Sequence, residues 1–239
     1  MIQIKNLKKK FENQNILNNF TLNIEKNKTT VILGESGCGK TVLLKHLTGF
    51  YHSDAGEIII DGLKLDKTNI KVLNEIRKKL TLVFQHPALF DWLTVYENVA
   101  LPLHEHTQMK EESVKKKVNE KLDLVGLLGS ENKLPSQISL GMQKRVSIAR
   151  ALILNPDYIF FDEPTTGLDP IIAKNIISII KKLRSQVGTT SVIVSHDISM
   201  VYKVADDIAV MKNGRIIFTG ELDIFQKSKN SYLQNFQQK

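Results

Sequence analysis

Residues able to bind phosphate, a metal ion or water follow four short apolar runs of the sequence. The runs are residues 30–33, 80–84, 158–161 and 190–194, and they are followed by residues 34–41, by Gln85, by Asp162 with Glu163, and by residues 195–197. Runs rich in β-branched and aromatic residues are typical of strands buried in a parallel sheet. Ligands bind open α/β sheets at the carboxyl ends of the strands, so we expect the four groups to meet there.

Residues 34–41 match the pattern G-x-x-x-x-G-K-[ST], which has a specific use in phosphate binding. Its glycines allow backbone N–H groups to turn inward around phosphate oxygens, and the next helix directs its positive end to the same place. Lys40 would reach the β- and γ-phosphates, and the Thr41 hydroxyl would ligate Mg²⁺. The residues predicted to contact the nucleotide here are Gly34, Glu35, Ser36, Gly37, Cys38, Gly39, Lys40 and Thr41.

Two adjacent acids, Asp162 and Glu163, follow the third apolar run. An acid at the end of a hydrophobic strand suits Mg²⁺, held through water, so we assign Asp162 to the metal. The chain turns at Pro164, which would bring Glu163 into the same cleft to polarise the attacking water. His196 follows the fourth run and is expected to contact the γ-phosphate. The residues thus predict a Mg²⁺-dependent nucleoside triphosphatase, without indicating what the hydrolysis drives.

Helical patterns separate the predicted strands and suggest how the chain is organised. They cover residues 40–48, 114–125, 142–154 and 171–187, and this alternation predicts a doubly wound α/β sheet. Residues 2–5, 20–25 and 57–60 predict a small antiparallel sheet, and residues 208–218 predict a hairpin with a type I′ turn. We therefore expect an α/β P-loop NTPase fold with a mainly parallel core sheet, an antiparallel β subdomain and an inserted helical subdomain. The whole chain, 1–239, would be one domain, with its core at about 1–85 and 145–239 and the helical subdomain at about 86–144.

Composition excludes several classes of protein. Of 239 residues, 42% are hydrophobic and 24% charged, which argues against disorder and fibrous repeats. The sequence has no apolar run long enough to span a membrane and no signal peptide, and its single cysteine, Cys38, excludes an internal disulfide and favours a reducing cytoplasm. The net charge of +8 is best explained by solvated faces, with attraction to the inner membrane surface as the alternative. Aromatic residues do not interleave with the basic runs, so we expect no direct binding of nucleic acid.

The chain resembles the ATP-binding cassette (ABC) ATPases over essentially its whole length. Seven segments occur in that family's order: Phe11, residues 34–41, Gln85, the signature segment 139–142, the pair Asp162 and Glu163, residues 167–169, and His196. The resemblance implies that Phe11 stacks on adenine, that Lys40, Gln85, Glu163 and His196 act in catalysis, and that Thr41, Gln85 and Asp162 hold Mg²⁺. It also implies a homodimer that encloses two ATP molecules, in which Ser139, Gly141 and Asp169 contact the nucleotide bound by the other copy.

A narrower resemblance concerns residues 84–107 and Met142, which look like those of Mla-type ATPases. Such ATPases energise phospholipid movement, which implies docking on an integral-membrane permease at the cytoplasmic face of the inner membrane. A lipid- or substrate-binding protein would complete the system. Two alternatives stay open: an ABC importer subunit for another small solute such as an amino acid, and a non-transport ABC ATPase acting on DNA or ribosomes. The second is disfavoured because the chain has no second cassette, long coiled coil or zinc module.

Four further expectations concern single residues or short segments. The Cys38 side chain should be accessible in the phosphate loop. Leu140 stands where the family's signature has glycine. We expect this residue to have ordinary helical backbone angles and a side chain that points away from the nucleotide, against apolar neighbours. The alternative is a degenerate nucleotide site in a heterodimer. Residues 86–107, including Phe90 and Trp92, should form the surface that binds the permease, the alternative being the small core of the helical subdomain. The segment 104–106, His-Glu-His, should be a solvated loop rather than a metal site.

Overall fold

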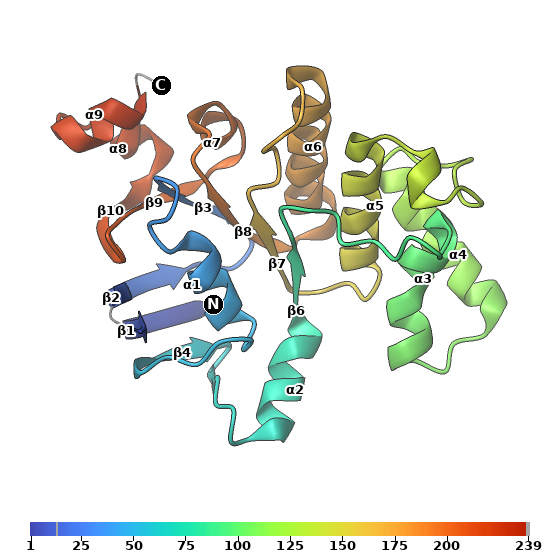
Figure 1. Ribbon diagram of the computed structural model, residues 1–239, viewed down its shortest axis with the longest axis horizontal. Helices are drawn as coiled ribbons and strands as arrows, with labels where there is room; N and C mark the ends of the chain where they lie inside the picture. Colours follow the sequence, from blue (N-terminus) through green and yellow to red (C-terminus); the bar gives the residue numbers. More distant parts are fainter. Residues whose placement is uncertain (13, 238–239) are drawn as a thin grey trace.

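Two β-sheets and the helices around them make up residues 1–12 and 14–237, the part of the chain that the computed structural model describes (Figure 1). Within these residues the larger sheet has six strands in the order β10-β9-β3-β8-β7-β6. Their bounds are β3 Thr29–Gly34, β6 Leu80–Val83, β7 Tyr158–Asp162, β8 Thr190–Ser195, β9 Asp207–Lys212 and β10 Arg215–Glu221. The pairs from β9 to β6 are parallel, and β10 is antiparallel to β9. The predicted mainly parallel core sheet is therefore confirmed.

The hairpin β9–β10 closes one edge of this sheet. Asn213 and Gly214 have φ angles of 48° and 72°, so both central residues of the turn are in the left-handed region that a type I′ turn requires. The predicted hairpin is thus confirmed, with strands that extend slightly beyond the predicted residues.

The smaller sheet is antiparallel, as predicted, and has the order β2-β1-β4-β5 in the described residues. Its strands are β1 Ile2–Phe11, β2 Gln14–Ile24, β4 Ala55–Ile60 and β5 Leu63–Lys64. Helix α1 (Lys40–Leu47) shares one hydrophobic core with this sheet and with one face of the parallel sheet. This core fixes the start of α1 beside the ends of the core strands, because Leu43, Leu44 and Leu47 are fully buried in it.

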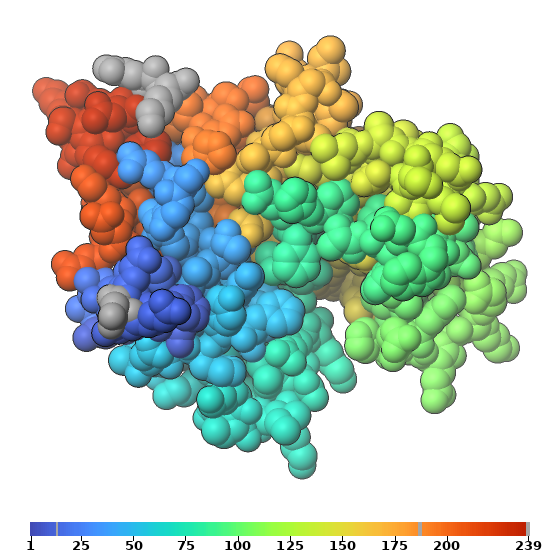
Figure 2. All heavy atoms as spheres, in the orientation of Figure 1, coloured from blue at the N-terminus to red at the C-terminus, as the bar shows by residue number. Residues whose placement is uncertain are grey.

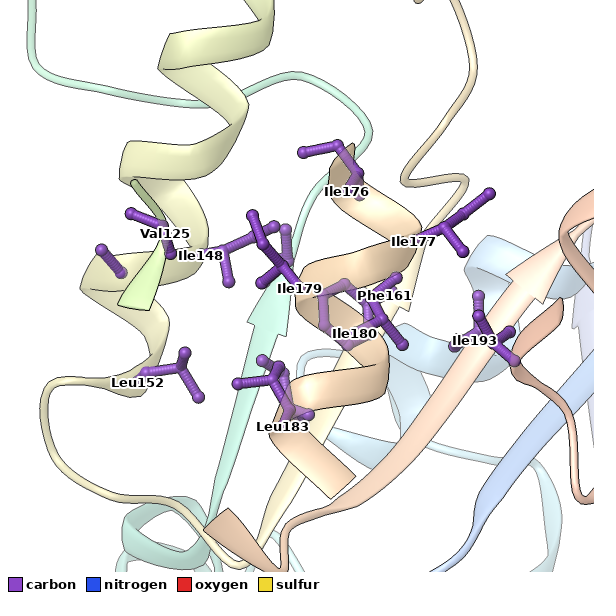
Figure 3. Close-up of a cluster of buried hydrophobic side chains, with 14 of the residues drawn as sticks. Val125, Ile148, Leu152, Phe161, Ile176, Ile177, Ile179, Ile180, Leu183 and Ile193 are labelled. Atoms are coloured by element: carbon purple, nitrogen blue, oxygen red, sulfur yellow. The ribbon is translucent and has the colours of Figure 1, made fainter. Parts of the chain in front are cut away.

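The other face of the parallel sheet is covered by α5 (Leu140–Leu152), α6 (Pro170–Lys182) and α7 (Ile198–Val204). Figure 3 shows isoleucine side chains of α6 lying between Ile148 and Leu152 of α5 and Phe161 and Ile193 of the sheet. The last residues of the predicted helix 171–187 form a π-helix, η2 (Leu183–Val187), instead of continuing α6. Helices α8 (Leu222–Gln226) and α9 (Ser231–Gln237) end the described chain.

The inserted helical segment stands beside the core as a separate lobe, coloured green to yellow-green in Figure 2. It contains α3 (Val95–His106), α4 (Glu111–Leu124) and the short 3-10 helix η1 (Pro135–Gln137), and residues 86–139 include no strand. The division at residue 144 stays a prediction, since α5 runs unbroken from the lobe into the core. The chain also forms α2 (Ile70–Lys79), which lies outside the helical patterns identified above. Among the described helices, none has the length and apolar character needed to cross a membrane.

Candidate active site

A cleft of about 380 Å³ lies at the carboxyl ends of the core strands. The residues that line it are Ile16, Ser36, Gly37, Gly39, Lys40, Thr41, Val42, Gln85, Glu163, Thr166 and His196. They come from the segments that follow β3, β6, β7 and β8, together with Ile16 of β2. The structure therefore brings together the four groups that the sequence places after the apolar runs.

The phosphate loop has the geometry that binding an anion requires. Gly37 and Gly39 have φ angles of 79° and 106°, and a Cβ at Gly39 would lie 2.9 Å from Met211 Cε and 3.0 Å from Ile16 O. Any side chain at position 39 would thus be strained as well as crowded. Helix α1 starts at the next residue, with no acidic residue in its first turn. The positive end of α1 therefore lies at the cleft, beside a glycine loop of the kind that binds phosphate through its backbone, and this fits a phosphate chain.

Lys40 places a buried cation in this loop, since only 6% of the residue is exposed. Its Nζ donates to Gly34 O at 2.8 Å and to Glu35 O at 3.0 Å, and it lies 3.4 Å from Glu163 Oε1. A buried ammonium is stable only when it is paired in this way. The same three donor hydrogens are available for phosphate oxygens once a nucleotide enters the cleft.

A hydroxyl and a carboxylate meet beside Lys40. Thr41 Oγ1 donates to Asp162 Oδ1 at 3.0 Å, and burial raises the pKa of the Asp162 carboxyl above its usual value. Gln85 lines both the main cleft and an adjoining cavity that Thr41 and Asp162 also line. These are oxygen ligands of the kind that Mg²⁺ takes, and Mg²⁺ commonly uses one or two carboxylates with substrate phosphates and water. The set fits Mg²⁺, and the described residues contain no cluster of three His, Cys, Asp or Glu that would favour another metal.

Glu163 turns into the cleft because its backbone leaves the strand conformation. Its φ is 49°, an uncommon value for a residue other than glycine, and its N–H donates to Val194 O at 3.0 Å. Its Oε2 lies 2.9 Å from His196 Nδ1 and accepts from Thr166 Oγ1 at 3.1 Å. The carboxylate is thereby fixed in orientation beside the phosphate loop. This turn is the one expected at Pro164.

Lys144 is a residue near the site that the sequence reasoning missed. It lies on α5, is almost completely buried, and donates from Nζ to Thr166 O at 2.8 Å and to Pro164 O at 3.3 Å. Burial lowers the pKa of this ammonium. Its signal in the sequence is a lysine on the buried face of a helix, three residues after Gly141. It ties α5 to the loop that carries Glu163.

Among the nucleotide contacts expected within one chain, Phe11, Gly34, Glu35 and Cys38 do not line the cleft. Phe11, at the end of β1, is 38% exposed, and its ring packs against Tyr51. The Cys38 side chain, predicted to be accessible in the phosphate loop, is half-buried against the core that contains α1. A Cβ at Gly34 would lie 2.7 Å from its Sγ, so the side chain points back toward the strand, and burial raises the pKa of the thiol. Any contact of Cys38 with phosphate would be made by its backbone.

The signature segment lies outside the lining of the cleft. Ser139 caps α5, since its Oγ accepts from Met142 N at 3.3 Å, and Asp169 caps α6 by accepting from Ile171 N and Ile172 N, both at 3.0 Å. Leu140 has no positive φ and begins α5, as expected. Its side chain is 46% exposed, so the expected packing against apolar neighbours is wrong.

Gly141 has a packing reason for lacking a side chain, because an added Cβ would overlap with Ile172 Cγ2 of α6. Its φ is not in the positive region, so close approach of the two helices, rather than backbone conformation, favours glycine here.

Phe90 and Trp92 form an exposed aromatic pair before α3. Their ring centroids are 5.3 Å apart, and Trp92 is 74% exposed. The fully buried side chain of Asn98 holds this turn, because its Nδ2 donates to Phe90 O, Leu93 O and Thr94 O and its Oδ1 accepts from Phe90 N. Leu89 and Tyr96, in contrast, pack against the core.

The His-Glu-His segment 104–106 is the end of α3, not a loop. His104 Nε2 lies 3.4 Å from Glu111 Oε2, and all three residues of the segment are exposed. Within residues 1–12 and 14–237, no group of three His, Cys, Asp or Glu side chains is arranged to hold a metal ion, and this includes the segment 104–106.

Comparison with known proteins gives a consistent result. Residues 17–166 match the ABC transporter family. The chain is 39% identical to the intermembrane phospholipid transport system ATP-binding protein MlaF of Haemophilus influenzae, over 99% of this chain and 89% of that protein. It is 38% identical to the probable ribonucleotide transport ATP-binding protein mkl of Mycobacterium leprae, over 98% of this chain and 68% of that protein.

Among solved structures, the chain is similar to the dimeric ATP-binding cassette MJ0796 in a post-hydrolysis state with ADP and Pi. The TM-score is 0.84 at 34% identity, over 93% of this chain and 99% of that one. It is also similar to cbiO1 of Clostridium perfringens, part of the transporter complex cbiONQ, with a TM-score of 0.85 at 29% identity over 95% and 90% of the two chains. The family match, the near full-length relatives and the cleft agree, and the chain therefore belongs to the ABC transporter family as an ATP-hydrolysing subunit that uses ATP and Mg²⁺.

Proposed function

We propose that this chain drives a transporter that moves phospholipid or a related lipid across or between membranes. The observation that carries the proposal is the near full-length similarity to MlaF of Haemophilus influenzae, whose name assigns it to phospholipid transport. Transport of another solute is the second candidate, because the mkl protein of Mycobacterium leprae, named for ribonucleotide transport, is 38% identical to this chain.

For the hydrolysis step, we assign Glu163 as the general base. It would take a proton from the attacking water as the water oxygen bonds to the γ-phosphorus and the bond to the β–γ bridging oxygen breaks. His196, whose Nδ1 lies 2.9 Å from Glu163 Oε2, would hold the carboxylate in place through that nitrogen, and its ring is also assigned to contact the γ-phosphate. Lys40 would exchange its ion pair with Glu163 for phosphate oxygens, which frees that carboxylate for the water.

Thr41, Asp162 and Gln85 are the residues assigned to Mg²⁺. The ion, when bound, supplies positive charge that offsets the charge developing on the phosphates. The Thr41–Asp162 hydrogen bond of 3.0 Å already orients two of these oxygen ligands toward each other. Phe11 is assigned to the nucleotide base, which would cover its exposed ring.

A second copy of the chain would complete each site. Ser139, Gly141 and Asp169 lie at the starts of α5 and α6, outside the cleft of their own chain. A helix start attracts phosphate, so these residues are suited to a nucleotide held by a partner. The dimeric state of the similar cassette MJ0796 supports this assembly. The permease would hold the dimer at the cytoplasmic face of the inner membrane, and a lipid-binding protein would exchange cargo with it.

We assign the exposed pair Phe90 and Trp92 to the contact with the permease. Exposed apolar patches commonly mark partner surfaces, and Asn98 gives this one a fixed backbone. Trp92→Ala should lower the fraction of the chain recovered with detergent-solubilised membranes, while ATP binding stays unchanged. Leu128→Ala, which removes another exposed apolar side chain of the helical lobe, is the matched control. Equal loss of membrane recovery and ATP binding would instead identify the pair as part of the lobe's core.

The cargo is tested on the complex purified from membranes and reconstituted in vesicles. Fluorescent phospholipid should be moved in an ATP-dependent manner, and ATPase activity should depend on the phospholipid content of the vesicles. ATP-driven uptake of a ribonucleotide or an amino acid, without movement of phospholipid, would replace the lipid proposal by the second candidate.

A further inference from the structure

The loop between α1 and β4 holds the end of β1 that carries Phe11. The Asp54 carboxylate accepts from Lys9 Nζ at 2.8 Å and from Lys10 N at 2.7 Å, and Asp54 N donates to Lys8 O at 2.9 Å. Asp54, an exposed residue, thus makes three hydrogen bonds to three consecutive residues of the strand. Two of these bonds involve backbone N–H groups, so they constrain the path of the chain directly before Phe11.

Tyr51, in the same loop, contacts the Phe11 ring itself. The two ring centroids are 5.4 Å apart with an interplanar angle of 69°, the edge-to-face arrangement that aromatic rings favour. Lys9 Nζ lies 5.2 Å from the Phe11 centroid and is held there by its ion pair with Asp54. The ring is therefore fixed on two sides, yet more than a third of the residue is exposed and available to a ligand.

The other side of Tyr51 is attached to the phosphate-binding helix. Tyr51 N and Phe50 N both donate to Lys45 O of α1, at 3.0 and 2.9 Å. The Tyr51 ring lies 5.8 Å from the His46 ring and 5.3 Å from Lys45 Nζ, measured to ring centroids. His46 is buried in α1 and bonds to Val42 O through Nδ1 at 2.7 Å, so this contact is to a rigid part of the helix. Tyr51 thus lies between the helix that starts the phosphate site and the ring proposed to stack on the base.

We infer that Tyr51 and Asp54 are positioning residues that hold Phe11 at a fixed place relative to α1, ready to stack on the nucleotide base. This inference rests on the proposed stacking role of Phe11. An unsupported aromatic side chain at a strand end would lose conformational freedom on binding, and that loss weakens affinity. Since phosphates bind at the start of α1 and the base at Phe11, a loop that contacts both sets the distance between the two halves of the site.

The test compares a ligand that has a base with one that lacks it. Binding of MgATP and of magnesium inorganic triphosphate to the purified full chain is measured by displacement of a fluorescent nucleotide. Tyr51→Ala should weaken MgATP binding about 3- to 10-fold, the size of one edge-to-face contact, and leave triphosphate binding unchanged. In steady-state kinetics the same variant should raise KM for ATP with little change in kcat. Tyr51→Phe keeps the ring and should restore wild-type affinity.

Phe50→Ala is the matched control, because this neighbouring ring is 59% exposed and contacts Arg77 instead of Phe11. It should not change MgATP binding. Asp54→Ala should give a smaller loss of the same kind, and it tests the inference if Tyr51→Ala does not fold, as judged by circular dichroism. In a Phe11→Ala background, Tyr51→Ala should have no further effect, because the two residues act as one unit.

Two results would overturn the inference. One is unchanged MgATP affinity in a folded Tyr51→Ala protein. The other is an equal loss of MgATP and triphosphate binding, which would show that Tyr51 acts through α1 and the phosphate loop. A different result, the absence of ATP hydrolysis by the wild-type chain, would contradict the proposed function. In that case the comparison of MgATP and triphosphate binding would still test the role of Tyr51.

Discussion

We assign the starts of α1 and α5 to phosphate binding. The two sites differ in how much of each is supplied by a single chain. At the start of α1, Lys40 is buried and paired, and Thr41 is bonded to Asp162 of a neighbouring strand. At the start of α5, Ser139 caps its own helix and Leu140 is 46% exposed. Both ends attract anions by the same physics. The difference teaches that folding assembles one half of the proposed composite site, whereas the other half needs a second copy.

Glu163→Gln tests the completed half and should have the largest effect. Glutamine keeps the size of the side chain and can still accept from Thr166 Oγ1, as Glu163 does at 3.1 Å, but it cannot take a proton from water. We expect phosphate release to fall by about 10²- to 10⁴-fold, with ATP binding retained and a stable ATP-bound dimer on size-exclusion chromatography. Glu112→Gln, an exposed change on α4, is the control. Near-wild-type turnover of a pure preparation would remove Glu163 from the role of general base.

Lys40→Ala should weaken the binding of MgATP, in addition to any effect on the hydrolysis step. The variant removes a buried cation that bonds to Gly34 O and Glu35 O, and phosphate oxygens would lose the same donor. Charge-assisted hydrogen bonds contribute about 1.5–3 kcal/mol, so MgATP binding should weaken by about 10- to 100-fold. Isothermal titration measures this, with the exposed Lys71→Ala as control. If MgATP affinity were preserved while kcat fell, Lys40 would act in the transition state only.

The two helix starts also differ in how well the sequence predicts them. The phosphate loop is predictable because its glycines, its lysine and the buried strand before it lie within about a dozen consecutive residues. The turn at Glu163 is predictable for the same reason, since Pro164 follows it directly. The core strands β3, β7 and β8 are equally clear, because strands buried on both faces consist of short apolar runs.

The features of the site that the sequence does not reveal depend on contacts between segments that lie far apart in the chain. Lys144 reaches a loop 20 residues away, and Gly141 is small because α6 crosses close to it. The direction of the Cys38 side chain depends on the path of the glycine loop against the core, which the residue types alone do not determine. Helix α2 is a different case, because its apolar residues recur at helical spacing in a segment that is otherwise charged or polar. The sequence therefore carries a signal for this helix, which the prediction overlooks.

Gly141→Ala separates a packing role from a phosphate-binding role at the incomplete half. The added Cβ would meet Ile172, whose β-branched side chain has little freedom on a helix. Overpacking costs about 1–3 kcal/mol and the better helix propensity of alanine offsets up to about 1 kcal/mol, so we expect the free energy of unfolding to fall by about 1 kcal/mol. Urea unfolding of the isolated chain measures it, with Leu140→Ala as the exposed neighbour. Unchanged stability would leave contact with the partner's nucleotide as the reason for glycine.

Leu140→Gly should have the smallest effect and bears most directly on the second copy. Leu140 has ordinary helical geometry and its side chain is exposed, so the backbone gains little from glycine at this position. Glycine would remove the side chain that covers the backbone N–H groups at the start of α5, which favours contact with phosphate. It would also destabilise the first turn of the helix, since glycine costs about 1 kcal/mol relative to good helix formers. These effects oppose each other, and the ATPase rate should change only a few-fold.

The rate of the Leu140→Gly variant is compared with that of the parent chain, both alone and together with the permease. An active parent that changes little supports a functional homodimer, in which Ser139 and Gly141 suffice to meet the partner's nucleotide. A parent that turns over slowly alone and is accelerated by the permease supports the same assembly, because the permease would then align two exposed helix starts that the free chains align poorly. An inactive parent that glycine rescues would instead identify a degenerate signature, and the intact one would have to come from a different ATPase in a heterodimer.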